Sequence, residues 1–302
     1  FGRAGGGVVN LITRSGTNKL HGTAGFVLDS TRDDAISSSL AADPAIRARG
    51  KNLAGTEQQF DGTLGGPVIR DKMFYHLSYL ELRQFSTSSN EMVTPTAAGR
   101  ATIERLFPRG TSRNADLLMD ISKGFEGVSR VAPVELGNGR PAVEMGRLIT
   151  HYAQAQTVRQ YGAKIDNRFG TRDTLAGRFL IHDNVAPNGG ETLSFPSFIT
   201  SSTERSKSVS AYHTHVFSPT VTNELRPGYT RFVLDSPLDM ANPLGRTMPQ
   251  IDIAGINTTS SSRYGISSTF PQGRTFNNYS LQDTASIIKG THTFRFGGEL
   301  MS

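Results

Sequence analysis

Hydrophobic and polar residues alternate along several stretches of this chain, most clearly between Phe60 and Arg83. In the second half of that stretch, apolar and aromatic positions alternate with mixed ones: Met73, Tyr75, Leu77 and Tyr79 against Phe74, His76, Ser78 and Leu80. Successive side chains of a strand point to opposite faces, so the stretch predicts two strands joined by a charged turn at residues 70–72. Such a hairpin is typical of a transmembrane β-barrel, but a soluble antiparallel sheet has the same pattern.

The same alternation recurs along the chain and predicts an all-β protein of about nine strands, preceded by a short apolar strand at Val8–Thr13. Pro227 lies inside one strand, and because proline cannot donate to a ladder, a bulge or distortion is expected there. Besides the two within Phe60–Arg83, the predicted strands are His21–Asp29, Val158–Phe169, Thr174–Asp183, Arg205–Ser218, Val221–Asp235, Phe276–Ile288 and His292–Leu300.

The predicted connections alternate between very short and long. Short turns are expected at residues 70–72, 171–173, 219–220 and 289–291, and loops of about twenty to seventy residues at 30–59, 85–157, 184–204 and 236–275. Outer-membrane barrels have short turns on the periplasmic rim and long extracellular loops on the other. A soluble sandwich has no reason to alternate in this way, so the lengths favour a partial transmembrane antiparallel β-barrel.

Two short helices are expected inside the long segment 85–157. Thr94 and Pro95 have the residue types that begin a helix, and apolar residues at helical spacing follow as far as Pro108. A second helix is predicted over Ala115–Ile121, after Asn114.

Composition narrows the function classes. The 32 basic residues are scattered without a run of five, which argues against a nucleic-acid partner despite the net charge of +6. The chain has no cysteine, so it has neither disulfides nor a thiolate metal site. It starts at Phe1 and stops at Ser302 within an alternating pattern, so both ends are expected to be cuts in a longer protein.

Motifs of catalysis and of cofactor binding are missing from the sequence. It contains no G-x-S-x-G, no H-E-x-x-H and no phosphate-binding G-x-G-x-x-G or G-K-[ST] pattern after its first glycines. His213 and His215 share a strand face and could bind a metal with a third ligand, but strand histidines of a barrel are more often lumenal or interfacial. We therefore predict a protein that is not an enzyme, with no metal site and no cofactor.

Charged residues within the predicted strands are expected to face the barrel lumen, because charge on the lipid face is destabilising. In that position they either line the passage of a ligand or simply satisfy a polar interior. These lumen-facing candidates are Arg168, Arg178, Glu224, Arg226, Arg295 and Glu299.

Several phrases resemble TonB-dependent outer-membrane receptors, more narrowly their Oar-like group. The stretch GRAGGGVVNLITRSGTNKLHGTAGF at Gly2–Phe26 resembles the family's junction of plug and barrel, and FDGTLGGPV at Phe60–Val68 resembles its next landmark. Further matches to Oar-like sequences lie at Thr94–Ala98, His213–Thr220 and Lys289–Glu299, and the resemblance is strong at the strand pairs and weak in the loops.

The resemblance implies that residues 1–19 are the end of a plug domain and residues 20–302 the N-terminal part of a barrel of about 22 strands. It implies energised uptake of an extracellular small ligand, whose identity and binding residues stay unknown. It also implies an outer-membrane location among lipid and a TonB-type periplasmic energy-coupling partner, which binds a segment upstream. Full-length Oar-like members carry a carboxypeptidase-regulatory-like domain before the plug. The expected plug–barrel junction residues are Gly6, Gly7, Asn10, Arg14 and Gly16.

Two alternatives stay open from the sequence. A non-transporting structural or adhesion barrel of the outer membrane would keep the hairpins without the plug. A soluble secreted β-sandwich would need polar residues on its outer face, whereas strand faces such as that of Leu175 and Phe179 are apolar.

Overall fold

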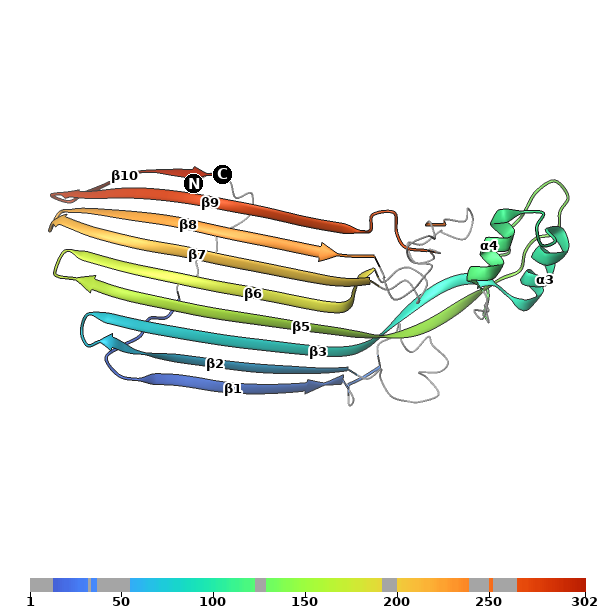
Figure 1. Ribbon diagram of the computed structural model, residues 1–302, viewed down its shortest axis with the longest axis horizontal. Coiled ribbons are helices and arrows are strands. Elements are labelled where there is room, and N and C mark those ends of the chain that lie inside the picture. Colours follow the sequence, from blue (N-terminus) through green and yellow to red (C-terminus); the bar gives the residue numbers. More distant parts are fainter. Residues whose placement is uncertain are drawn as a thin grey trace.

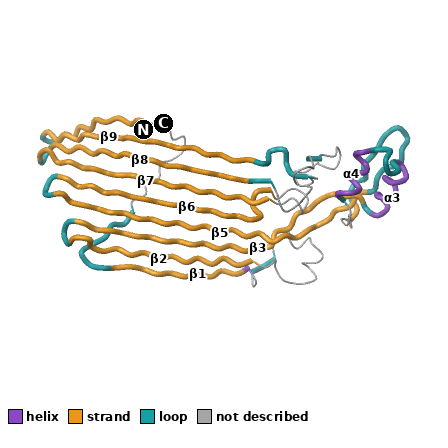
Figure 2. Tube along the Cα trace, viewed as in Figure 1, coloured by secondary structure: helices purple, strands orange, loops and turns teal. Residues whose placement is uncertain are grey.

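The structure, a computed structural model, describes residues 13–31, 34–36, 55–122, 129–191, 200–238, 250–251 and 265–302. All described strands join one antiparallel sheet in the order β1-β2-β3-β5-β6-β7-β8-β9-β10, with β4 beside β5 (Figure 1). Figure 2 shows two helices outside the sheet, at its far end. The strands are β1 (His21–Ser30), β2 (Gly55–Ile69), β3 (Met73–Pro95), β4 (Ser129–Arg130), β5 (Met145–Phe169), β6 (Asp173–Glu191), β7 (Thr200–Ser218), β8 (Val221–Ser236), β9 (Gln272–Lys289) and β10 (His292–Met301).

The predicted all-β fold is confirmed. Each of the nine predicted strands within residues 20–302 corresponds to one of β1–β3 and β5–β10. Among the described residues β1 and β10 pair on one side only, so the sheet is open, as a partial barrel requires. The predicted strand at Val8–Thr13 lies almost wholly outside the described residues.

Several predicted loops are shorter than expected because the strands extend into them. β3 runs to Pro95 and β5 begins at Met145, and the two pair along this whole length. Their outer parts are polar, for example Ser86–Asn90 opposite Thr150–Gln154, and so lack the alternation that marks a strand in sequence. In these outer parts of the strands neither face has to be hydrophobic. Backbone hydrogen bonds between the strands alone maintain the ladder there. For the same reason β2 begins at Gly55, and β6 and β7 leave only residues 192–199 between them.

The helices lie close to their predicted places but begin at other residues. α3 (Ala97–Leu106) is capped by Thr96, whose side chain accepts a hydrogen bond from the Gly99 amide, rather than by Thr94. Thr94 is fully buried and still belongs to β3. α4 (Arg113–Ile121) begins two residues earlier than expected, with Ser112 as its cap. Both predicted starts were wrong by two residues, because several residues of capping type stand near each start.

The short turns meet at one rim of the sheet and the long connections at the other (Figure 1). The tight turns require left-handed backbone at Asp71 (φ 62), Gly170 (φ 67) and Gly290 (φ 62). We call these two ends the short-turn rim and the long-loop end. The predicted alternation of connections is confirmed, although residues 192–199 form a much shorter connection than expected.

The strand register separates an apolar from a polar face, because directly opposed residues lie on the same face. One row of partners crosses seven strands on the apolar face: Leu64, Leu77, Ala163, Phe179, Val209, Tyr229 and Tyr279. The adjacent row lies on the polar face: Thr63, Ser78, Gly162, Leu180, Ser208, Thr230 and Asn278.

Pro227 interrupts the sheet only locally. It stands opposite Leu281 on β9, and β8 keeps its register with β7 on either side. Between the pairs Ser210–Gly228 and His213–Leu225 the ladder with β7 is not formed. The expected distortion is therefore an interruption on one side, without a bulge.

Buried apolar side chains gather beyond the sheet, in an outer lobe of residues 92–122 and 129–148 (Figure 1). One cluster holds Ile103, Val143 and Met145. In a second cluster Met92 packs against Ile266, which comes from the connection between β8 and β9. None of the helices in the described part of the chain is long and apolar enough to cross a membrane.

Candidate ligand passage on the polar face

All six predicted lumen-facing residues lie on the polar face of the sheet. Arg168 stands opposite Thr174, and Arg178 opposite Lys164. Glu224 and Arg226 stand opposite Thr284 and Gln282 of β9. On β10, Arg295 and Glu299 stand opposite Ser286 and Gln282. The structure therefore groups the six by face, and their exposure to a lumen stays a prediction.

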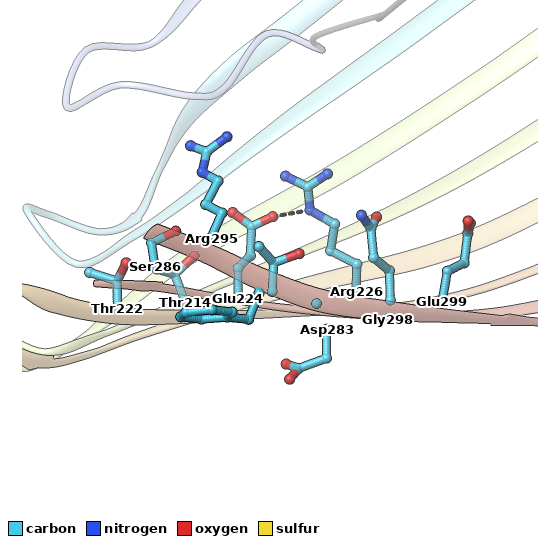
Figure 3. A pocket seen from close by; sticks show the side chains of 13 residues that line it. Thr214, Thr222, Glu224, Arg226, Asp283, Ser286, Arg295, Gly298 and Glu299 are labelled. Carbon is cyan, nitrogen blue, oxygen red and sulfur yellow. Dashed lines mark ion pairs between the residues drawn. The ribbon is translucent and has the colours of Figure 1, made fainter. Parts of the chain in front are cut away.

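Four of the six meet in one hollow of about 810 Å³ on β8–β10. Glu224, Arg226, Arg295 and Glu299 line it together with hydroxyl and amide side chains such as Thr222, Ser286 and Gln282. Their side chains project from the same side of the ribbon, whereas that of Asp283 points to the opposite side (Figure 3). Arg168 and Arg178 do not line this hollow.

The hollow carries carboxylates and guanidinium groups side by side. Glu224 forms an ion pair with Arg226, whose guanidinium lies over the Tyr212 ring at 5.6 Å from its centroid. Neighbouring donors and acceptors of both charges suit reversible binding of a polar or zwitterionic ligand. The residues that line it include no cysteine and no histidine, so the hollow holds neither a thiol nor a serine–histidine pair for covalent chemistry.

Residues 13–19, before β1, are bound to the sheet rather than paired as a strand. Lys164 on the polar face donates a hydrogen bond to the Ser15 hydroxyl at 2.7 Å. Gly16 is buried against β2 and β3. Asn18 donates to the Asp71 carboxylate at 2.5 Å and accepts from the Asp71 amide at 2.8 Å. Of the predicted junction residues, Arg14 is exposed, and Gly6, Gly7 and Asn10 lie outside the described residues.

Lys164 and a second hollow were missed from the sequence. Lys164 also pairs with Asp166 at 3.1 Å. The second hollow, of about 280 Å³, lies at the long-loop end of β2, β3 and β5, where Gln84 donates to Glu57 at 2.6 Å. Both Gln84 and Glu57 belong to the polar face. Continuing the two-residue alternation of Phe60–Arg83 by a few residues at each end would have placed both side chains on that face.

A family model described as an outer membrane beta barrel domain matches residues 12–302. The chain belongs to this outer membrane β-barrel family. A barrel of this kind places the protein in the cell outer membrane, with the apolar face toward lipid. The soluble β-sandwich is thereby excluded, and the single sheet agrees, because a sandwich needs two packed sheets.

Two relatives are named as TonB-dependent proteins. The TonB-dependent transporter Oar of Myxococcus xanthus is 36% identical over 90 residues, which cover 26% of this chain and 7% of the relative. The probable TonB-dependent siderophore receptor PirA of Acinetobacter baumannii is 30% identical over 132 residues, which cover 41% of this chain and 15% of the relative. The matched segments thus span only a small part of either relative.

His213 and His215 lie on the apolar face of this β-barrel domain, near the short-turn rim. Both contact one oxygen of Asp173, His213 at 3.0 Å and His215 at 2.6 Å. They are therefore not lumenal, and the interfacial alternative fits their position beside Phe217. Across the described ranges no group of three or more histidine, cysteine or acidic residues is placed to hold a metal ion.

Proposed function

We propose that this β-barrel domain belongs to an Oar-like TonB-dependent transporter, which takes up an extracellular small ligand through a plugged barrel. The observation that carries the proposal is the binding of residues 13–19 to the polar face, through Ser15 and Lys164, where a plug would leave its barrel. The two relatives, a TonB-dependent transporter and a probable TonB-dependent siderophore receptor, support the same class.

We assign residues 1–19 to the end of a plug domain and residues 20–302 to the N-terminal part of the barrel. In support, β1 begins at His21, and residues 13–19 form no strand of the sheet. The free sides of β1 and β10 would expose unpaired backbone groups in lipid, so we infer that further strands close the barrel. The segment that binds the TonB-type partner and any regulatory-like domain would precede the plug.

In the proposed passage, the ligand moves from the long-loop end toward the short-turn rim along the polar face. The hollow of Glu224, Arg226, Arg295 and Glu299 would bind it there. Residues 13–19 are held by few side-chain bonds, and one hydrogen bond is worth about 1 kcal/mol. A pull from the periplasm could therefore detach the segment without unfolding the sheet.

Uptake by cells that express the full-length protein tests this proposal. We would compare them with a deletion strain, using radioiron-labelled ferrichrome, radiolabelled maltoheptaose and a radiolabelled tripeptide, with and without a proton ionophore. Entry of one probe should require both the gene and the proton gradient. Glu224→Gln should lower that uptake several-fold, whereas Asp283→Asn, on the same hollow but pointing the other way, should not.

A test that needs no known ligand uses the absence of cysteine from the chain. Ser15→Cys in the full-length protein should react faster with a membrane-impermeant maleimide in energised cells than after ionophore treatment. Ser208→Cys, on the polar face away from the junction, should react equally in both. Equal labelling of Ser15→Cys, together with no gene-dependent uptake, would favour a non-transporting structural or adhesion barrel.

A further inference from the structure

A band of charged side chains crosses the apolar face just beyond a row of tyrosines. Tyr79 and Tyr161 are register partners, as are Tyr229 and Tyr279. Two residues further toward the long-loop end stand Glu81, Arg159 and Arg231. A step of two residues is about 7 Å along a strand. Tyrosines mark the membrane interface, so the band lies at the depth of the outer-leaflet headgroups.

Most charges of the band are matched within it. Glu81 contacts Arg83 at 3.0 Å and Arg159 at 3.1 Å. Asp183 contacts Arg205 at 2.5 Å. Each carboxylate of these pairs therefore already holds at least one arginine.

Lys207 and Arg231 are the exception. They stand directly opposite each other on β7 and β8, and both are exposed. Like charges at directly opposed positions destabilise a sheet. Arg231 donates to the Asn277 amide oxygen at 3.2 Å. Within the described part of the chain no carboxylate lies within ion-pair distance of either residue.

The pair opens into a hollow of about 500 Å³ on β6–β8. Arg205 and Asp183 border it as an ion pair, and Asp235 lies nearer the long-loop end. An anionic group above Lys207 and Arg231 would relieve their repulsion and receive charge-assisted hydrogen bonds from both. Asp183 and Asp235 could accept hydrogen bonds from hydroxyl groups beside that anion.

We propose that Lys207 and Arg231 bind a phosphate of a phosphorylated glycolipid, the lipopolysaccharide of the outer leaflet. The site faces lipid, lies at headgroup depth and is at the extracellular end, where this glycolipid presents phosphates on sugars rich in hydroxyl groups. The proposal rests on the outer-membrane location and not on transport, so either can fail without the other.

Lipopolysaccharide that co-purifies with the full-length protein in mild detergent tests the site. The double variant Lys207→Gln/Arg231→Gln should retain about tenfold less per barrel, the change expected when hydrogen bonds to a charged group are lost. The control Arg70→Gln/Lys289→Gln removes the same charge at the short-turn rim and should retain the wild-type amount. Equal retention by all three proteins, or equal loss in both variants, would overturn the proposal.

Rebinding to delipidated protein identifies the lipid. Phosphorylated lipid A should bind, and dephosphorylated lipid A and phosphatidylglycerol should bind about tenfold more weakly. Comparable binding of phosphatidylglycerol would show a general anion site and contradict the assignment.

Heat-modifiable migration in a gel verifies that each variant is folded. If the double variant does not fold, Lys207→Arg should retain lipopolysaccharide and Lys207→Gln should lose it, and equal retention by these two would overturn the site.

Discussion

Gly16 lies so close to Tyr75 that a Cβ atom at position 16 would stand 2.2 Å from the Tyr75 carbonyl oxygen. A second backbone oxygen, that of Gly66, would be 2.7 Å away. Both belong to strands of the sheet and have no freedom to move aside. The absence of a side chain at position 16 is therefore what allows residues 13–19 to lie against β2 and β3.

Gly16→Ala should detach residues 13–19 from the sheet, because overpacking against fixed backbone costs about 1–3 kcal/mol. We expect tryptic cleavage after the exposed Arg14 to become several-fold faster in the detergent-solubilised full-length protein. Gly177→Ala is the control, since its Cβ would meet nothing within 4 Å. Unchanged cleavage in Gly16→Ala would show that the segment does not depend on this contact.

The paired hydrogen bonds between Asn18 and Asp71 predict a cross-link. Asn18→Cys/Asp71→Cys should form a disulfide on mild oxidation, because the two short side chains are in direct contact. The chain has no cysteine of its own to compete. Asn18→Cys/Asp61→Cys should remain reduced, and the mobility difference on a non-reducing gel distinguishes them. An equal yield in both pairs would argue that the segment is not held at the turn.

The two faces of the sheet predict different responses to an added charge. Ile165 is 48% exposed on the apolar face, four residues from Tyr161 toward the short-turn rim. Ile165→Arg should destabilise the folded barrel by about 2–4 kcal/mol in urea unfolding from lipid vesicles, because arginine is costly at the bilayer midplane. Ser208→Arg, on the polar face, should cost only the hydrogen bond with Thr230, about 1 kcal/mol. Similar losses would contradict the assignment of the faces.

The outer lobe should unfold separately from the sheet. Met145 is 1% exposed within the cluster of Ile103 and Val143. Met145→Ala should remove about 2–5 kcal/mol of packing, and Ile103→Val about 1 kcal/mol. Hydrogen exchange should accelerate strongly across α3 and α4 in the first variant and mildly in the second, with β6–β9 unchanged. Faster exchange throughout the sheet would show that lobe and barrel are one cooperative unit.

The sequence by itself determined the strands that cross the membrane and the faces they present. The strands at Met73–Tyr79 and Val158–Phe169 can be predicted from sequence because lipid on one side and water on the other impose a period of two on each strand separately. The turn at Asp71 can also be predicted locally, since few residue types allow the chain to reverse direction within three residues. The six charged residues predicted to face the lumen followed from this alternation of faces along each strand.

Only the tertiary structure decided which distant residues meet. The pairing of Ser86–Asn90 with Thr150–Gln154 depends on a ladder between segments whose polar sequences have no alternation. The contact of Met92 with Ile266, and the opposition of Lys207 and Arg231, follow from register between strands and loops far apart in the chain. Register depends on the energy of the whole sheet, in which each pair contributes little, so local sequence could identify the strands but not the partners.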